Sequence, residues 1–229
     1  MSSLGSLPAP GALIFDLDGT LVDTVETRIQ AWLRTFEEES IPADRDHVAG
    51  LIGADGKKLA REVAERADRR VSDDDAERID KRSGEIYNEL NTDPKPTAGA
   101  HSLLVALEKS DLKWAIATSS RREQTHVSIK ALDLPEPPQI VDGSHVEHAK
   151  PAPDLLLLAA KNLRTEPRDS WYIGDSTWDM RAARTAGMQA IGVAYGAAGE
   201  SDLVDAGAEV VTSLGALESD LRGRGLLSS

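Results

Sequence analysis

The chain of 229 residues contains no cysteine. This absence excludes disulfides, thiolate catalysis and cysteine-based zinc or iron–sulfur sites. No window approaches the roughly 18 consecutive apolar residues that a membrane-spanning helix needs. The opening residues, MSSLGSLPAPG, lack the basic stretch and long apolar run of a signal peptide. We therefore expect a cytoplasmic protein that does not enter a membrane.

Basic residues are also scarce, with 26 Lys and Arg against 39 Asp and Glu, a formal net charge of -13 and a sequence pI of about 4.8. Nucleic acids and anionic membrane surfaces need a basic footprint, so neither is an expected partner. A small anionic substrate stays possible, because salt screens charges over about 8 Å and a local cationic cluster can dominate inside a cleft. The sequence leaves a monomer and a homodimer equally open.

The hydrophobic pattern predicts an α/β fold with a Rossmann-like parallel sheet. A short apolar strand at residues 12–15 is followed by helical periodicity, without a convincing strand, over residues 24–94. Strands and helices then alternate to the end of the chain. The domain boundaries that follow are residues 1–22 and 95–229 for the α/β core and residues 23–94 for an inserted helical cap. Predicted core strands after the cap are residues 113–118, 139–144, 170–175, 189–195 and 208–213.

Chemically active side chains follow several of these strands, and ligands bind at the carboxyl ends of parallel strands. The group contains acids, hydroxyls and one lysine. Its members are Asp16, Asp18, Thr118, Ser119, Lys150, Asp175 and Asp179.

Each motif has an ordinary structural explanation when taken alone, such as a turn at DGT or a helix start at GDSTWD. Together they indicate one site. Converging carboxylates repel one another unless a cation is present, and an all-oxygen ligand set suits Mg²⁺. Two acids two residues apart, Asp16 and Asp18, can serve as nucleophile and proton shuttle. The set therefore predicts phosphoryl transfer through an aspartyl-phosphate.

Four segments in this order resemble the motifs of the haloacid dehalogenase-like superfamily: FDLDGTLVDT, AIATSS, AKPAPD and GDSTWDMRAARTAG. The resemblance spans nearly the whole chain and is to the branch of phosphoglycolate phosphatases and β-phosphoglucomutases with a helical cap. One departure is Ala149, where the family usually has glycine before Lys-Pro.

The resemblance implies roles for the motif residues. Asp16 would be the nucleophile and Asp18 the general acid and then the base. Asp16, the backbone carbonyl of Asp18, and Asp175 would hold Mg²⁺, with Asp179 in or next to the metal shell. Thr118 and the Ser119 backbone would bind the phosphoryl group, and Lys150 would pair with Asp16 and the phosphate.

In this family a glycine-containing cap loop selects the substrate, which makes Gly53, Asp55, Lys57 and Lys58 candidates for specificity. A solvated helix start explains the same residues equally well. Lys95, in the Lys-Pro pair of the linker at residues 91–99, receives no chemical role.

The favoured function is a Mg²⁺-dependent phosphatase acting on a small soluble phosphomonoester, such as phosphoglycolate, a sugar phosphate or a nucleotide. A β-phosphoglucomutase-like sugar phosphomutase is the alternative, and Thr20 slightly favours hydrolysis. A non-catalytic binding protein on this fold is a third possibility, which the intact acidic set disfavours. Asp18 also argues against the dehalogenase and phosphonoacetaldehyde hydrolase branches, which lack an acid there.

Overall fold

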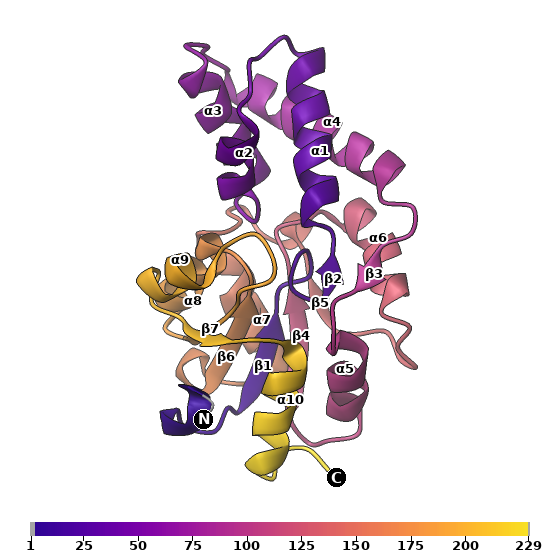
Figure 1. The fold of residues 1–229 in the computed structure, drawn as a ribbon, viewed down its shortest axis with the longest axis vertical. Helices are drawn as coiled ribbons and strands as arrows, with labels where there is room; N and C mark the ends of the chain where they lie inside the picture. The colour runs from indigo at the N-terminus through magenta and orange to yellow at the C-terminus, as the bar shows by residue number, and fades with distance from the viewer. Residues whose placement is uncertain (1–2, 229) are drawn as a thin grey trace.

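The computed structural model describes residues 3–228. Its centre is a six-stranded sheet in the order β5-β4-β1-β6-β7-β8, in which all neighbouring strands are parallel (Figure 1). This confirms the predicted α/β parallel-sheet core. The strands of this sheet are β1 (Ala12–Phe15), β4 (Lys113–Ala117), β5 (Ile140–Val141), β6 (Ser170–Gly174), β7 (Gln189–Val193) and β8 (Glu209–Val211).

All five strands after the cap are shorter than predicted, and two of them, β5 and β8, lose half of their predicted length or more. The expected strand at residues 139–144 stops at Val141, because the Asp142 side chain accepts a hydrogen bond from the Ser144 N–H and starts a short 3₁₀ turn. The last strand covers only Glu209–Val211 of the predicted residues 208–213.

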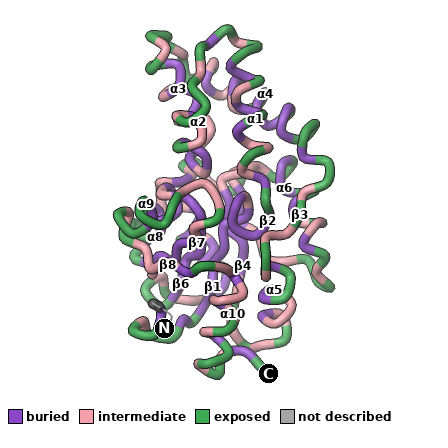
Figure 2. Tube along the Cα trace, viewed as in Figure 1, coloured by how far each residue is buried: buried purple, intermediate pink, exposed green. Residues whose placement is uncertain are grey.

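Helices cover both faces of the sheet. They are α5 (Ala100–Glu108), α6 (Arg122–Ala131), α7 (Asp154–Leu163), α8 (Thr177–Ala186), α9 (Glu200–Asp205) and α10 (Leu214–Gly223). Successive residues of a strand point to opposite faces, and β1 illustrates the consequence. Leu13 and Phe15 pack in the core formed with α5 and α10, whereas Ala12 and Ile14 pack in the core formed with α7 and α8. Figure 2 shows this burial along the sheet.

Residues 25–90 form only helices, which lie over the carboxyl ends of the strands (Figure 1). They are α1 (Val25–Glu38), α2 (Arg45–Leu51), α3 (Gly56–Arg66) and α4 (Asp73–Leu90). These helices have their own apolar core, which includes Trp32, Phe36, Leu59 and Ile79. Burial of each such side chain contributes about 1.5–3 kcal/mol to the free energy of folding. The inserted helical cap is therefore present as predicted.

Some elements were not predicted. Helices α2 and α9 have only 7 and 6 residues, too short to give a clear periodic pattern. Strands β2 (Val22–Asp23) and β3 (Lys95–Pro96) pair antiparallel at the junction of core and cap. The linker around Lys95 is therefore part of a two-stranded ribbon. No helix within residues 3–228 is long and apolar enough to cross a membrane.

Candidate active site

Three adjacent strands bring their carboxyl ends together. Strand β1 lies between β4 and β6, and the residues that follow these strands are Asp16, Thr118 and Asp175. All three are buried. The Asp16 N–H donates to the Ile173 carbonyl at 2.8 Å, which holds the start of the loop against β6. The parallel sheet thus places residues more than 150 positions apart at one edge.

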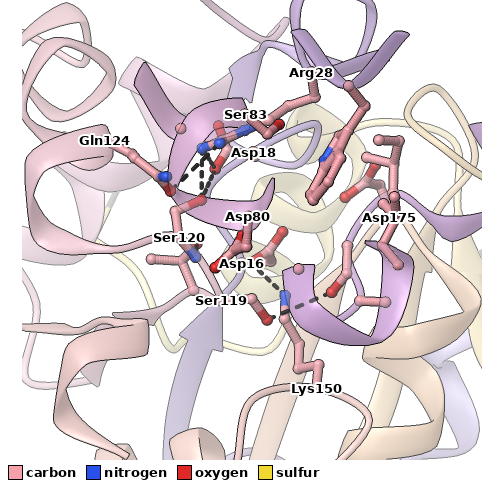
Figure 3. A pocket seen from close by; sticks show the side chains of 18 residues that line it. Asp16, Asp18, Arg28, Asp80, Ser83, Ser119, Ser120, Gln124, Lys150 and Asp175 are labelled. Carbon is pink, nitrogen blue, oxygen red and sulfur yellow. Dashed lines mark hydrogen bonds and ion pairs between the residues drawn. The ribbon is translucent and has the colours of Figure 1, made fainter. Parts of the chain in front are cut away.

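Lys150 reaches this edge from the loop before α7. Its Nζ lies 2.6 Å from Asp16 Oδ1 and 2.7 Å from Asp179 Oδ1, and its side chain is only 1% exposed. Figure 3 shows Lys150 beside Asp16 in the pocket. Burial opposes a charge at this position, but the two carboxylates raise the pKa of Lys150 above its ordinary value. The lysine is therefore an ammonium that links two acids.

The carboxylates of Asp16, Asp175 and Asp179 form a buried cluster whose ligand atoms lie within 4.8 Å of one another. Burial raises the pKa of Asp16 well above its usual value, opposed by Lys150 and reinforced by Asp179 and Asp175. Burial, with Asp179, also raises the pKa of Asp175 to about 7. One lysine does not neutralise three acids. A hard divalent cation with oxygen ligands fits this donor set.

Asp175 is held by two donors. The Thr20 hydroxyl donates to its Oδ1 at 2.8 Å, and the Ala197 N–H donates to its Oδ2 at 2.7 Å. Gly19 makes this close approach possible, because its φ is +81° and a Cβ there would lie 2.2 Å from Asp175 Oδ2. The DGT sequence is therefore both a turn and a support for the acid across the site.

Asp179 lies in the first turn of α8. Its Oδ2 accepts hydrogen bonds from the Ser176 N–H at 3.0 Å and the Ser176 hydroxyl at 2.6 Å, while Oδ1 faces Lys150. Ser176 in turn accepts from the Asp179 N–H, which completes a capping box. The helix start predicted from GDSTWD is present, and the same residues fix the orientation of Lys150.

Asp18 is surrounded by donors that sequence reasoning missed. Arg28 Nη2 and the Ser120 hydroxyl contact its Oδ2 at 2.9 and 2.6 Å, and the Thr24 and Tyr87 hydroxyls contact Oδ1 at 2.7 and 2.9 Å. Although burial opposes it, Arg28 and these hydroxyls together lower the pKa of Asp18. Its carboxylate form is therefore favoured.

Arg28 comes from α1 of the cap and also stacks 3.3 Å from the centre of the Tyr87 ring. A cation near a helix N-terminus is electrostatically unfavourable. The position of Arg28 in the first turns of the predicted helix therefore indicates that it has an acidic partner elsewhere. The sequence does not identify that partner.

Thr118 and Ser119 both line the pocket with Asp16. The Thr118 hydroxyl accepts from the Ser120 N–H at 3.1 Å, which shapes the turn after β4. The Ser119 hydroxyl lies 3.5 Å from the carbonyl of Gly53 in the cap. The two residues are therefore at the boundary between core and cap.

The four cap-loop candidates for specificity lie in different surroundings. Gly53 lines the pocket, with φ of +94°, and the Asp55 N–H donates to the Lys150 carbonyl at 2.8 Å while its side chain caps α3. Lys57 pairs with Glu77 at 3.7 Å, and Lys58 contacts Glu62. Among residues 3–228, the lining of the catalytic pocket includes neither lysine.

Comparison with known proteins places this arrangement in a family. Residues 13–193 match the model of the haloacid dehalogenase-like hydrolases. The chain belongs to that family.

Relatives and solved structures agree with this assignment. The chain is 30% identical over 190 residues to a β-phosphoglucomutase of Bacillus subtilis, covering 81% of this chain and 84% of that protein. It is 29% identical over 215 residues to a phosphoglycolate phosphatase of Rhodospirillum rubrum, covering 91% and 86%. The crystal structure of a hydrolase from Pseudomonas syringae superposes with a TM-score of 0.87 at 33% identity, covering 93% and 98%. The predicted branch is confirmed.

Proposed function

We propose that this phosphoric monoester hydrolase is a Mg²⁺-dependent phosphatase that removes the phosphoryl group from a small phosphorylated metabolite through an aspartyl-phosphate on Asp16. The observation that carries the proposal is the buried Asp16 in contact with Lys150 at 2.6 Å, beside the carboxylates of Asp175 and Asp179. The family supports a phosphatase or phosphotransferase role for the chain.

The residues that would hold Mg²⁺ are Asp16, the backbone carbonyl of Asp18, and Asp175, with Asp179 beside them. The donor chemistry fits, because the described cluster is made of buried carboxylates and contains no histidine. When bound, Mg²⁺ supplies positive charge that stabilises the phosphoryl oxygens in the transition state.

The first half-reaction uses Asp16 as the nucleophile. A carboxylate oxygen attacks phosphorus, the bond between phosphorus and the ester oxygen breaks, and the leaving oxygen takes a proton from Asp18, which reacts here from its less populated protonated form. Lys150 holds the attacking carboxylate in place and offsets its charge as the phosphoryl group approaches. Thr118 and the backbone of Ser119 orient the phosphoryl oxygens from the end of β4.

In the second half-reaction, Asp18 accepts a proton from water, which attacks the aspartyl-phosphate and releases inorganic phosphate. The four donors around Asp18 favour its carboxylate form, which is the form that accepts a proton.

The test is phosphate release from p-nitrophenyl phosphate, phosphoglycolate, a sugar phosphate and a nucleoside monophosphate, each with Mg²⁺ and with a chelator. We expect release that depends on Mg²⁺ and returns when Mg²⁺ is added back in excess. Absence of release from every ester, together with conversion of glucose 1-phosphate in the presence of a bisphosphate primer, would instead support the mutase. Full activity in the chelator would contradict the metal assignment.

Thr20→Val tests how the metal site is supported. The change keeps the side-chain volume and removes the hydroxyl that donates to Asp175 Oδ1. We expect the Mg²⁺ concentration for half-maximal activity to rise about 10-fold or more, because residues that orient metal ligands typically contribute that much to affinity. Thr185→Val is the matched control, since its hydroxyl donates to the Arg181 carbonyl on an exposed part of α8. An unchanged Mg²⁺ dependence in Thr20→Val would contradict the prediction.

A further inference from the structure

The cap contributes a partly buried acid to the catalytic pocket that no step of the proposed mechanism uses. Asp80, from α4, lines the pocket together with Asp16, and its side chain is 17% exposed (Figure 3). Its Oδ2 accepts a hydrogen bond from Arg121 Nη2 at 2.8 Å. Its Oδ1 accepts no hydrogen bond from residues 3–228 and occupies the space above Gly56, where a Cβ would lie 1.9 Å from it. A free acceptor therefore faces the region where the part of the substrate beyond the phosphate must lie.

Two further polar groups in the same wall have free hydrogen-bonding capacity. Ser83 is 4% exposed and lines the pocket, and its hydroxyl has no hydrogen-bond partner within residues 3–228. Gln124, 8% exposed, accepts from the Arg121 N–H at 3.1 Å through Oε1, which leaves its Nε2 donors free. The hydrogen bond to Oε1 fixes the orientation of the Gln124 amide group. Its Nε2 donor therefore lies toward Gly84 of the cap.

No cation in this part of the pocket is free to meet a second anion. Of the charged side chains that line the pocket within the described chain, the cations are Arg28 and Lys150, which pair with Asp18 and with Asp16 and Asp179. Arg121, nearby, is shared by Glu77 and Asp80.

The cavity next to the catalytic pocket is also lined by more acidic than basic side chains. It shares Gly56, Asp80, Ser119 and Gln124 with the catalytic pocket. Its charged lining consists of three acids and two bases, a net charge of -1: Asp55, Asp80, Glu147, Lys57 and Arg121. A leaving group that extends from the phosphate into this space meets an excess of negative charge.

From these contacts we propose that Asp80 is a specificity-determining residue that favours uncharged, hydroxyl-bearing leaving groups and rejects leaving groups with a second negative charge. The inference rests on the proposed phosphatase function. Asp80 accepts a hydrogen bond from one hydroxyl of the substrate. Ser83 and Gln124 form hydrogen bonds with the adjacent hydroxyls of the substrate. The preferred substrates are then sugar or polyol monophosphates. Phosphoglycolate and bisphosphates are poor substrates, because their second anion faces Asp80 without a free cation.

A matched pair of substrates tests the proposal. Glycerol 3-phosphate and 3-phosphoglycerate share a three-carbon skeleton, and the second replaces a hydroxymethyl group with a carboxylate. We expect the wild-type enzyme to have a kcat/KM at least about tenfold higher for glycerol 3-phosphate, since like charges in a closed site are strongly unfavourable. In Asp80→Asn this ratio falls at least about tenfold, chiefly through a lower KM for 3-phosphoglycerate.

Glu85→Gln is the matched control. Glu85 is an exposed acid of the same helix, contacts Arg82 at 3.2 Å and lies outside both cavities. It should leave the substrate ratio unchanged. Ser83→Ala should lower kcat/KM for glycerol 3-phosphate.

The outcomes separate the two claims. If p-nitrophenyl phosphate is hydrolysed but the wild-type enzyme shows no preference for glycerol 3-phosphate, the selectivity proposal is wrong. The proposed phosphatase function is then still supported. Equal shifts in Asp80→Asn and Glu85→Gln would also overturn it, because the effect would then come from the overall charge of α4 and not from the pocket. If no ester is hydrolysed under any condition, both proposals fail together.

Discussion

Asp16→Asn is expected to lower phosphate release by at least about 10⁴-fold, because loss of a covalent nucleophile has effects of this size or larger in other hydrolases. The amide keeps the shape of the side chain but has no carboxylate to attack phosphorus. Lys150 keeps a partner at 2.7 Å in Asp179, so the fold should be retained. The measurement is the rate of phosphate release from p-nitrophenyl phosphate with saturating Mg²⁺, alongside a thermal unfolding curve.

A covalent intermediate gives an independent readout of the same substitution. Rapid acid quench of wild type during turnover should trap an acid-stable phosphoryl group on the peptide that contains residue 16, and Asp16→Asn should trap none. Asp23→Asn is the matched control, since Asp23 belongs to the same motif but is exposed on β2. Loss of activity in both variants, or a phosphoryl group on another peptide, would contradict the assignment of the nucleophile.

The clustering of the candidate catalytic residues could be predicted because they follow strands. A parallel sheet forces the ends of β4, β1 and β6 together, so Asp16, Thr118 and Asp175 meet whatever the intervening sequence is. Lys150 was found the same way, from the loop after the predicted strand at residues 139–144. These positions depend on the topology of the sheet, which hydrophobic periodicity reports well.

The partners of Asp18 could not be predicted in this way. Arg28 and Tyr87 come from α1 and α4, and their contact with Asp18 depends on how the cap packs on the core. Tyr87 and Asp18 are 69 positions apart, and no local sequence pattern predicts a contact over that distance. The contacts of the cap lysines could not be predicted for a related reason: Lys57 and Lys58 pair with Glu77 and Glu62, acids whose approach depends on how the cap helices fold and pack.

Asp80 was missed because an acid in the middle of a charged helix normally faces solvent. Its neighbours in α4 include exposed ion pairs such as that between Arg82 and Glu38. What distinguishes it is the absence of a side chain at Gly56, which leaves room for the Asp80 carboxylate beside the start of α3. The sequence contains both residues, but only the packing of the two helices connects them.

Lys150→Met is expected to be the most destabilising substitution in the site, with a loss of about 3–5 kcal/mol, because removing one partner of a buried ion pair leaves the other charge uncompensated. Here two carboxylates, those of Asp16 and Asp179, lose their cation at once. Methionine fills most of the volume, so the loss reports charge rather than a cavity. Phosphate release should also fall steeply, since the attacking carboxylate loses its support.

Asp179→Asn in the Lys150→Met background separates electrostatics from packing. Asparagine can still accept from Ser176 through its carbonyl oxygen, as Asp179 does at 2.6 and 3.0 Å, and it removes one of the uncompensated charges. The double variant should therefore be more stable than Lys150→Met alone, whereas independent effects would make it less stable. Urea unfolding of wild type, both single variants and the double variant, in chelator so that metal does not mask the effect, gives the coupling energy. A double variant whose loss equals the sum of the two single losses would show that Lys150 and Asp179 do not act as a pair.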